Sequence, residues 1–297
     1  MPFCVLFFNQ RAGYGFIMPA LILLVIFSIL PILVAFVISF TDMNLISLGD
    51  FSTLNFVGLD NYIAVLKDPL FLKSVSNTVV YVVIGVPLVI ACSLGTALLI
   101  NFSQAKIFVA FRLIFYTPSI TNVIAVAVIW SYLYNPQFGF FNYLLSFLHI
   151  PPIQWLQDPA IAKYSLIILA VWKAIGINMI IFLAALQGIP REYYEASELD
   201  GASRWQQLYK ITIPLLKFAL FFVTVTTLIG WLQFFEEPFI MTEGGPLNST
   251  MSISLYIYNN GFKFSNFGFA SAASFILFIA IVVITLIQFR GQAKKDN

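Results

Sequence analysis

Residues 16–40, FIMPALILLVIFSILPILVAFVISF, contain no charged side chain. A helix needs about 20 mostly apolar residues, at 1.5 Å rise per residue, to cross the hydrocarbon core of a bilayer. The stretch is longer than the apolar core of a secretory signal peptide, which has about 7–15 residues. The sequence between Ser28 and Pro31 also does not resemble a cleavage site. We therefore expect an uncleaved first transmembrane helix near the N-terminus.

Five further apolar stretches of similar length follow along the chain. The six expected spans are residues 15–40, 75–101, 107–134, 161–187, 214–240 and 267–289. Several contain proline, which membrane helices tolerate because neighbouring helices and Ser or Thr side chains satisfy the freed carbonyl groups. The sequence thus predicts an all-α membrane protein of six transmembrane helices. Residues 1–14 form its N-terminal segment and residues 15–297 its membrane domain.

The composition supports this class and excludes others. Hydrophobic residues make up 60% of the chain and charged residues 9%, whereas soluble domains carry about 25% charged residues. The net charge of +2 and the lack of a basic run argue against nucleic-acid binding. His149, Cys4 and Cys92 do not have the spacing of a metal site, and the Gly-Lys pair of a P-loop is absent. We expect no catalytic residue, metal or cofactor in this chain.

Lysine and arginine are distributed unevenly between the two ends of the expected spans. Ten lie on the side of both termini, and four lie on the opposite side. The ten are Arg11, Lys106, Arg112, Arg191, Arg204, Lys210, Lys217, Arg290, Lys294 and Lys295. Because these residues accumulate in cytoplasmic loops, we expect both termini to be cytoplasmic. The loops 41–74, 135–160 and 241–266 then face outward.

One cytoplasmic loop, residues 188–214, GIPREYYEASELDGASRWQQLYKITIP, carries helix signals of its own. Pro190 suits the first position of a helix, and Gly201 suits the position just after its end. Ser203 and Gln206 have the spacing of a capping box, which begins a second helix. We therefore expect two short helices broken at the glycine, rather than a flexible linker.

The first of these helices is acidic, with small and apolar residues beside the acids: Glu192, Glu195, Glu198 and Asp200 next to Tyr193, Tyr194, Ala196 and Leu199. Two interpretations are open, namely an amphipathic segment on the lipid headgroups and a helix that inserts into a basic groove of another protein. Helices on membrane surfaces are typically rich in Lys and Arg. The acidic composition therefore favours a protein partner.

At this point the loop resembles a known motif. Glu195-Ala196-Ser197, Gly201 and Ile211-Thr212-Ile213-Pro214 are similar to the EAA motif of ABC importer permeases: Glu-Ala-Ala, three residues, Gly, nine residues, Ile, one residue, Leu-Pro. Every spacing agrees, with Ser and Ile replacing one Ala and the Leu. The resemblance implies the type I (MetI-like) permease fold of this family, with the loop as a coupling helix on a cytoplasmic ATPase. The implied ATPase-coupling positions are Glu195, Ala196, Ser197, Asp200, Gly201 and Ala202.

Other segments resemble the carbohydrate branch of that family, the maltose and multiple-sugar type. They are residues 56–62, Asn77-Thr78, 242–246 and 267–272. The resemblance implies a second permease subunit, two ABC ATPase subunits that bind ATP and Mg²⁺, and an external solute-binding protein. It places the binding-protein contact at Gly244, Gly245 and Pro246. It also implies a bacterial or archaeal cytoplasmic membrane and a sugar substrate, with oligosaccharides favoured.

Polar residues inside the spans are candidates for a substrate pathway. Lys173 lies midway along the fourth expected span. A lysine at that depth should face the bundle interior or a water-filled cavity, unless it snorkels to an interface. The resemblance also places Trp172, Thr227, Trp231 and Phe234 on sugar-facing positions, and Tyr116 and Ser119 flank Pro118 on a further polar face. Interhelical hydrogen bonding and plain packing remain alternatives for these residues.

Glu236 and Glu237 are adjacent carboxylates near the expected outer end of the fifth span. We expect them to line an outer vestibule or to meet a binding protein. A rival hypothesis is a secondary transporter or channel that uses Lys173 and these glutamates as a charge relay. Such proteins are often built from internal repeats, and none is evident here. The favoured prediction is a non-enzymatic permease subunit that forms half of the pathway of a sugar ABC importer.

Overall fold

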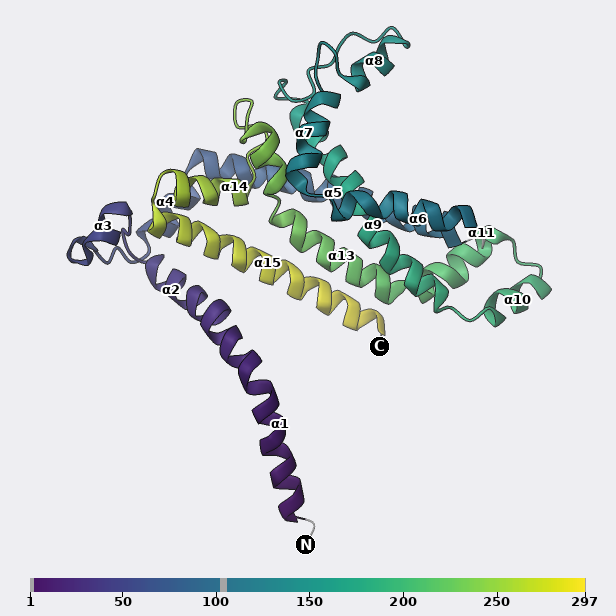
Figure 1. Ribbon diagram of the computed structural model, residues 1–297, viewed down its shortest axis with the longest axis horizontal. Coiled ribbons are helices and arrows are strands. Elements are labelled where there is room, and N and C mark those ends of the chain that lie inside the picture. The colour runs from purple at the N-terminus through teal and green to yellow at the C-terminus, as the bar shows by residue number, and fades with distance from the viewer. Residues whose placement is uncertain (1–2, 102–105, 297) are drawn as a thin grey trace. The chain divides into compact units, whose positions relative to one another are not determined.

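The computed structural model describes residues 3–101 and 106–296 (Figure 1). Within these residues the regular structure is helical, and extended segments pair only in two isolated bridges, Thr41 with Phe56 and Asn44 with Asn266. The all-α prediction is confirmed. Residues 1–2 of the expected N-terminal segment lie outside the described residues, as do residues 102–105 and 297 of the expected membrane domain.

The elements alternate between long apolar helices and short helices in the loops. In chain order they are α1 (Phe3–Leu24), η1 (Val25–Ile29), α2 (Leu30–Ile38), α3 (Leu45–Gly49), η2 (Phe51–Thr53), α4 (Asp60–Lys67), α5 (Pro69–Asn101), α6 (Lys106–Ile120), α7 (Val123–Leu133), α8 (Phe140–Ser146), α9 (Ala162–Gln187), α10 (Glu192–Leu199), α11 (Arg204–Gln207), η3 (Leu208–Thr212), α12 (Ile213–Leu215), α13 (Lys217–Leu232), η4 (Pro238–Thr242), α14 (Ile253–Tyr258), η5 (Asn259–Lys263) and α15 (Phe267–Asp296).

Four continuous helical segments of the described chain are long and apolar enough to cross a membrane. They are Tyr14–Ile38, Pro69–Asn101, Ala162–Gln187 and Phe267–Gln292. Two bent helix pairs raise the number to as many as six, if each pair is one span. All six expected stretches therefore fall on apolar helices, but the third and fifth are not straight.

The third expected span, 107–134, is broken by a bend of 101° between α6 and α7. Asn122 causes a new helix to begin at this point, because its side chain accepts a hydrogen bond from the Ile124 amide as an N-cap. The Asn122 side chain therefore serves the first turn of α7.

The fifth expected span, 214–240, also differs from the structure. The chain bends by 65° between the segment Arg204–Leu215 and α13, at Leu216, whose ψ of 0° leaves the helical range. Helix α13 then ends at Leu232 instead of residue 240, and Gln233 departs from helical geometry. The earlier end releases residues 233–235 from the helix, so the chain can turn back toward α9 before a new helical turn begins at Glu236.

The described chain forms two compact units, residues 3–68 with 257–278 and residues 69–256 with 279–296. In the first, the Asn61 side-chain amide donates to the carbonyl oxygens of Ser39 and Thr41 at 2.9 and 2.8 Å. Both oxygens of the Asp42 carboxylate accept hydrogen bonds from Asn55, first of all from its side chain, which holds the pKa of Asp42 below its usual range. The loop after the first expected span is therefore an ordered structure.

The second unit contains the helix bundle that positions the candidate site. Helix α9 packs against α5 and α6, and α5 also packs against α13, as Figure 1 shows. Glycine permits two of these close approaches. A Cβ atom at Gly176 of α9 would overlap the carbonyl oxygen of Phe115 in α6, and one at Gly85 of α5 would overlap the ring of Trp231 in α13. Small residues at helix crossings are typical of membrane bundles.

Candidate functional site

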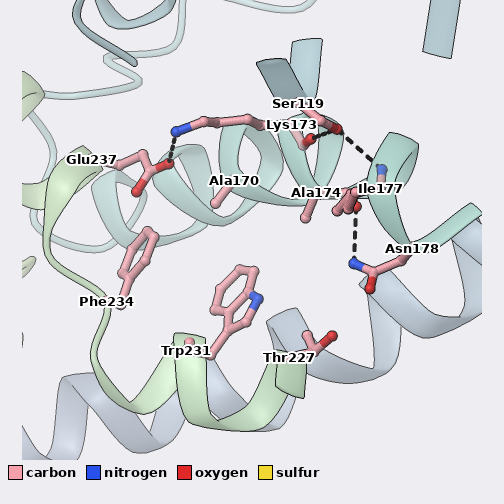
Figure 2. Close-up of a pocket in the computed structure, with 11 residues that line it drawn as sticks. Ser119, Ala170, Lys173, Ala174, Ile177, Asn178, Thr227, Trp231, Phe234 and Glu237 are labelled. Atoms are coloured by element: carbon pink, nitrogen blue, oxygen red, sulfur yellow. Dashed lines mark hydrogen bonds and ion pairs between the residues drawn. The ribbon is translucent and has the colours of Figure 1, made fainter. Parts of the chain in front are cut away.

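A cavity of about 310 Å³ opens in the second unit between α6, α9, α13 and the segment after α13 (Figure 2). One wall is a single face of α9 and the opposite wall is the C-terminal half of α13. Its lining residues are Ser119, Ala170, Lys173, Ala174, Ile177, Asn178, Thr227, Gly230, Trp231, Phe234 and Glu237.

Five of the seven expected pathway residues line this one cavity. They are Ser119, Lys173, Thr227, Trp231 and Phe234. The structure thus brings together residues from three separate expected spans. Because such a grouping does not by itself establish a pathway, their functional role stays a prediction.

Trp172 and Tyr116 do not line the cavity. The Trp172 ring instead faces the Trp130 ring of α7, with centroids 5.3 Å apart. A helix turns about 100° per residue, so neighbours such as Trp172 and Lys173 point in different directions. Tyr116 lies where α6 crosses α9, with its Cα close to Gly176.

The sequence analysis did not assign several lining residues to the pathway. Ala170, Ala174, Ile177 and Asn178 follow the spacing i, i+3, i+4, i+7 and i+8 together with Lys173. That spacing is one helix face, so the position of Lys173 alone could have predicted this wall. Glu237 had no comparable signal, because it lies after the end of α13.

The charged residues that line the cavity, Lys173 and Glu237, form a cluster with the neighbouring Glu236. The Lys173 ammonium lies 3.0 Å from a carboxylate oxygen of Glu236 and 3.7 Å from one of Glu237. The Lys173 side chain is 19% exposed, that of Glu236 57% and that of Glu237 only 8%. Lys173 therefore reaches carboxylates rather than a membrane interface. The sequence analysis joined these three residues only in the rival charge-relay hypothesis.

Ser119 links α6 to the cavity wall of α9. Its hydroxyl donates to the Lys173 carbonyl at 2.6 Å and accepts from the Ile177 amide at 3.3 Å. Residues 173 and 177 are hydrogen-bond partners in a regular α-helix, so the hydroxyl bridges one turn of α9. Asn178 donates from its side chain to the Ala174 carbonyl at 3.0 Å. Ser119 thus holds α6 against α9, whereas the hydrogen bond of Asn178 stays within α9.

The aromatic side of the cavity is tightly packed. The rings of Trp231 and Phe234 stack with centroids 5.2 Å apart and an interplanar angle of 12°. Tyr81 packs its ring edge to face against Phe234. Trp231 is only 6% exposed, because the other side of its ring meets Gly85. The indole is therefore fixed in place and presents little free surface to the cavity.

The loop at residues 188–214 contains the two expected short helices, α10 and α11. Gly201 has a positive φ of 77°. Its amide donates to the Glu198 carbonyl, and the Ala202 amide donates to the Ser197 carbonyl, which is the Schellman termination of a helix. The capping box of Ser203 and Gln206 is present. Both local predictions are confirmed, although α10 begins at Glu192, two residues after the expected Pro190.

The six expected coupling positions divide into exposed and inward-facing residues. Glu195, Ala196, Asp200 and Gly201 are exposed, whereas Ser197 and Ala202 are half-buried. The Ser197 hydroxyl donates to the Tyr194 carbonyl and accepts from the Gln207 side chain, so it holds α10 against α11. The sequence analysis missed this internal role.

Large apolar side chains also lie on the outside of this loop. Leu199 is 90% exposed, Trp205 68% and Tyr209 64%, and the last two rings stack on each other. Exposed apolar groups of this size typically mark a surface that another molecule covers. They were outside the predicted coupling set, although their position in an informative loop was a usable signal.

The loop at residues 243–252, which the sequence predicts to face outward, is held tightly against α5. The Asn77 side-chain amide donates to the carbonyls of Asn248 and Met251 at 3.0 and 2.9 Å. Tyr81 donates its hydroxyl to the Thr250 carbonyl at 3.0 Å. Of the three expected contact residues, Gly244 is buried, and Gly245 and Pro246 are half-buried.

The exposed tip of this loop is therefore not the Gly-Gly-Pro segment. Leu247 is 78% exposed, and Asn248 is also exposed. Both adopt positive φ values, of 49° and 57°. The Lys73 ammonium supports the tip from α5 by donating to the Leu247 carbonyl at 2.8 Å. A molecule that meets the loop from outside would contact Leu247 and Asn248 first.

Replacing Asn77 by alanine should loosen this loop. The change removes both donors to the loop and the acceptor of the Lys163 ammonium at 2.9 Å. Buried polar groups left without partners cost about 1–3 kcal/mol each. Hydrogen exchange of residues 244–252 should therefore accelerate at least about tenfold. The control Ser76→Ala, on the exposed side of the same turn, should leave the exchange rate unchanged. An exchange rate in Asn77→Ala equal to that of the wild type would contradict the role of Asn77 in holding the loop.

Comparisons with known proteins give the relatives of this chain. The sequence profile of a family described as "Binding-protein-dependent transport system inner membrane component" matches residues 61–293. The lactose transport system permease protein LacF of Rhizobium radiobacter is 36% identical over 287 residues, which cover 95% of this chain and 94% of that protein. The trehalose/maltose transport system permease protein MalF of Thermococcus litoralis is 34% identical, with coverages of 97% and 96%.

A solved structure has the same fold. One chain of a bacterial alginate ABC transporter, crystallised with an alginate pentasaccharide-bound periplasmic protein, superimposes with a TM-score of 0.82. The superposition covers 94% of this chain and 93% of that chain, at 24% sequence identity. This likeness confirms the expected fold class.

Proposed function

This chain belongs to the family of inner-membrane components of binding-protein-dependent transport systems, and from this membership we propose that it is a permease subunit of an ATP-driven sugar importer. It is a multi-pass protein of the cytoplasmic membrane. The relatives named above transport lactose and trehalose or maltose by their descriptions. We extend saccharide import to this chain, with oligosaccharides as the favoured substrates.

The observation that carries the coupling part of the proposal is the loop at residues 188–214. Two short helices meet at Gly201. The backbone φ at this position is positive, so only a residue that tolerates positive φ can stand there without strain. Glu195 and Asp200 are exposed beside the apolar side chain of Leu199. An acidic surface with an apolar centre suits a basic cleft of a partner protein. We assign the loop to docking on an ATPase subunit, which would bind ATP and Mg²⁺.

The proposed topology places this loop and both termini in the cytoplasm. The distribution of Lys and Arg supports that orientation. The loops near Asp42 and Leu247 would then face outward. There the exposed tip of residues 247–248 is our candidate contact for a solute-binding protein, next to the expected Gly244, Gly245 and Pro246.

We propose that the cavity beside Lys173 is the part of the transport pathway that this subunit contributes. Hydroxyl and amide groups of Ser119, Thr227 and Asn178 lie next to the apolar surfaces of Trp231 and Phe234. Ligand sites commonly combine an apolar lining with a few polar groups that fix orientation. A second, similar permease would complete the pathway. ATP binding in two ATPase subunits would move the coupling loops and switch the cavity between inward and outward access.

The Lys173 cluster is the one observation that favours the rival hypothesis of a secondary transporter. A lysine between two carboxylates can carry protons or bind ions. The family membership argues against proton or ion movement through this cluster as the source of energy for transport. The two hypotheses differ in what drives uptake, namely ATP with a binding protein or an ion gradient across the membrane.

Uptake into proteoliposomes tests the proposal. The full chain is purified with the subunits that accompany it, reconstituted, and supplied with internal ATP and the solute-binding protein encoded beside it. We expect ATP-dependent accumulation of at least one saccharide from a panel of mono- to pentasaccharides. We also expect the saccharide to stimulate ATP hydrolysis.

Two outcomes would contradict the proposal. Uptake that follows an imposed proton or sodium gradient without ATP would support the secondary transporter. If amino acids or peptides, but no saccharide, stimulate ATP hydrolysis, the protein would still be an ATP-driven importer, but its substrate would not be a sugar.

A further inference from the structure

The Lys173 cluster places one base and one acid, Lys173 and Glu237, on the cavity lining and a second acid, Glu236, beside it. The ammonium lies within 4 Å of both carboxylates. When all three groups are ionised, the cluster has one net negative charge. When either glutamate carries a proton, the cluster is neutral. In both states the ammonium keeps a carboxylate partner.

Other basic groups are too far away to change this balance at the cavity. Lys163 lies ten residues before Lys173 on α9, about 15 Å along the axis, and donates to the Asn77 side chain. On α6, Arg112 lies seven residues before Ser119, about 10 Å along the axis, and does not line the cavity. The part of α13 that lines the cavity contributes no charged residue. Within the described residues, the charge at this site comes from the cluster alone.

Two of the uncharged donors that line the cavity, Ser119 and Asn178, are also engaged. Ser119 donates its hydroxyl hydrogen to the Lys173 carbonyl, and Asn178 donates to the Ala174 carbonyl. A carboxylate that leaves water needs a cation or several hydrogen-bond donors as compensation. A sugar hydroxyl can both donate and accept, so the acidic cluster suits a sugar hydroxyl better than a carboxylate.

We infer that the Lys173–Glu236–Glu237 cluster makes the cavity selective for uncharged saccharides and excludes acidic sugars such as uronates. This inference rests on the proposed function of the cavity as a sugar pathway, and it names the substrate class. Glu236 and Glu237 act as specificity determinants because they neutralise the one lysine that could bind a carboxylate. The poorly exposed position of Glu237 strengthens the effect, since charges interact more strongly away from water.

Direct binding to the purified complex tests the inference without a contribution from the solute-binding protein. The ligands are a 1,4-linked galacturonate trisaccharide and its methyl ester, which have the same rings and differ in charge. Saturation-transfer NMR titrations on the complex in lipid nanodiscs give both dissociation constants. We expect the methyl ester to bind at least about tenfold more tightly than the acid, a difference of about 1.4 kcal/mol.

Removal of the two acids should reverse the preference. In the double variant Glu236→Gln/Glu237→Gln, Lys173 loses its counter-charges. The affinity for the galacturonate trisaccharide should therefore rise at least about tenfold, while the affinity for its methyl ester changes little. Glu236→Gln alone, at the more exposed position, should shift the ratio in the same direction if the double variant does not assemble. Glu243→Gln removes the same charge at an exposed residue outside the cavity and should leave the ratio unchanged.

The possible results separate the inference from the proposed function. Equal affinities of acid and ester in the wild type, or an unchanged ratio in both glutamine variants, would overturn charge selection and leave sugar import intact. Failure of both ligands to bind, while a panel of neutral oligosaccharides also fails, would reject the cavity as a sugar site and the inference with it.

Discussion

Replacing Gly201 by valine should lower the rates of saccharide-stimulated ATP hydrolysis and of uptake by at least about a hundredfold. The complex should still assemble. Gly201 has a φ of 77° and closes the end of α10 with two backbone hydrogen bonds. A residue with a Cβ in this left-handed region costs about 1–2 kcal/mol, and a β-branched residue is the least tolerated. The loop should therefore relax to another backbone path and change the angle between α10 and α11.

The damage should stay local, because nothing lies within 4 Å of a Cβ placed at Gly201. The strain is in the backbone alone and does not reach the packed spans. Gly201→Asn should keep most of the activity, since asparagine tolerates positive φ. Gly95→Ala, at a glycine of α5 that also has open space around it, serves as the control for adding a methyl group. Normal uptake by Gly201→Val would reject the loop as the coupling element.

Local features of this loop could be predicted because their partners lie close in sequence. The helix end at Gly201 uses carbonyls of Ser197 and Glu198, and the cap at Ser203 uses Gln206. The residue types alone therefore select the geometry. The spans could be predicted for a different reason, namely that a stretch of about 20 apolar residues has few stable alternatives to a membrane helix.

The bends of the spans could not be predicted from hydropathy. Asn122 lies within a long, mostly apolar stretch, and its hydrogen bond to the Ile124 amide shows that it starts α7. In the same way, the apolar residues after Leu232 extend the hydrophobic stretch although the helix has ended. Average hydropathy reports where a segment is stable, not where its backbone changes direction.

The partners of the candidate site are distant in sequence. Lys173 meets glutamates more than 60 residues away, and Asn77 holds a loop more than 170 residues away. Such pairs depend on how α5, α9 and α13 pack, and a single sequence contains no signal for that packing. The polarity of Ser119 and Lys173 and the family resemblance at Thr227, Trp231 and Phe234 therefore pointed to five of the cavity residues. Glu237 was joined to Lys173 only in the rival charge-relay hypothesis.

Replacing Lys173 by methionine should destabilise the protein by about 3–5 kcal/mol, the cost of leaving a buried charge without its partner. The change removes the ammonium from Glu237, whose side chain is 8% exposed, and from Glu236. The carboxylates would then repel each other in a poorly hydrated site. Thermal unfolding of the purified complex should show a lower Tm. Lys263→Met, which removes an exposed lysine, should stay within about 0.5 kcal/mol of the wild type.

A compensating variant distinguishes a lost ion pair from a simple packing defect. Lys173→Met combined with Glu236→Gln and Glu237→Gln removes all three charges and should recover most of the stability, because no unpaired charge remains. A triple variant as unstable as Lys173→Met would show that the lysine stem, rather than its charge, supports the fold.

Transport by the triple variant then separates the two hypotheses for the cluster. A charge relay needs groups that gain and lose protons or ions, so a secondary transporter would lose all uptake when the three charges are removed. In the proposed importer the driving force comes from ATP in the partner subunits, and the cluster fixes the charge of the cavity. We therefore expect the triple variant to retain ATP-dependent uptake of a neutral saccharide within about tenfold of the wild type, since packing replaces the ion pair at similar stability.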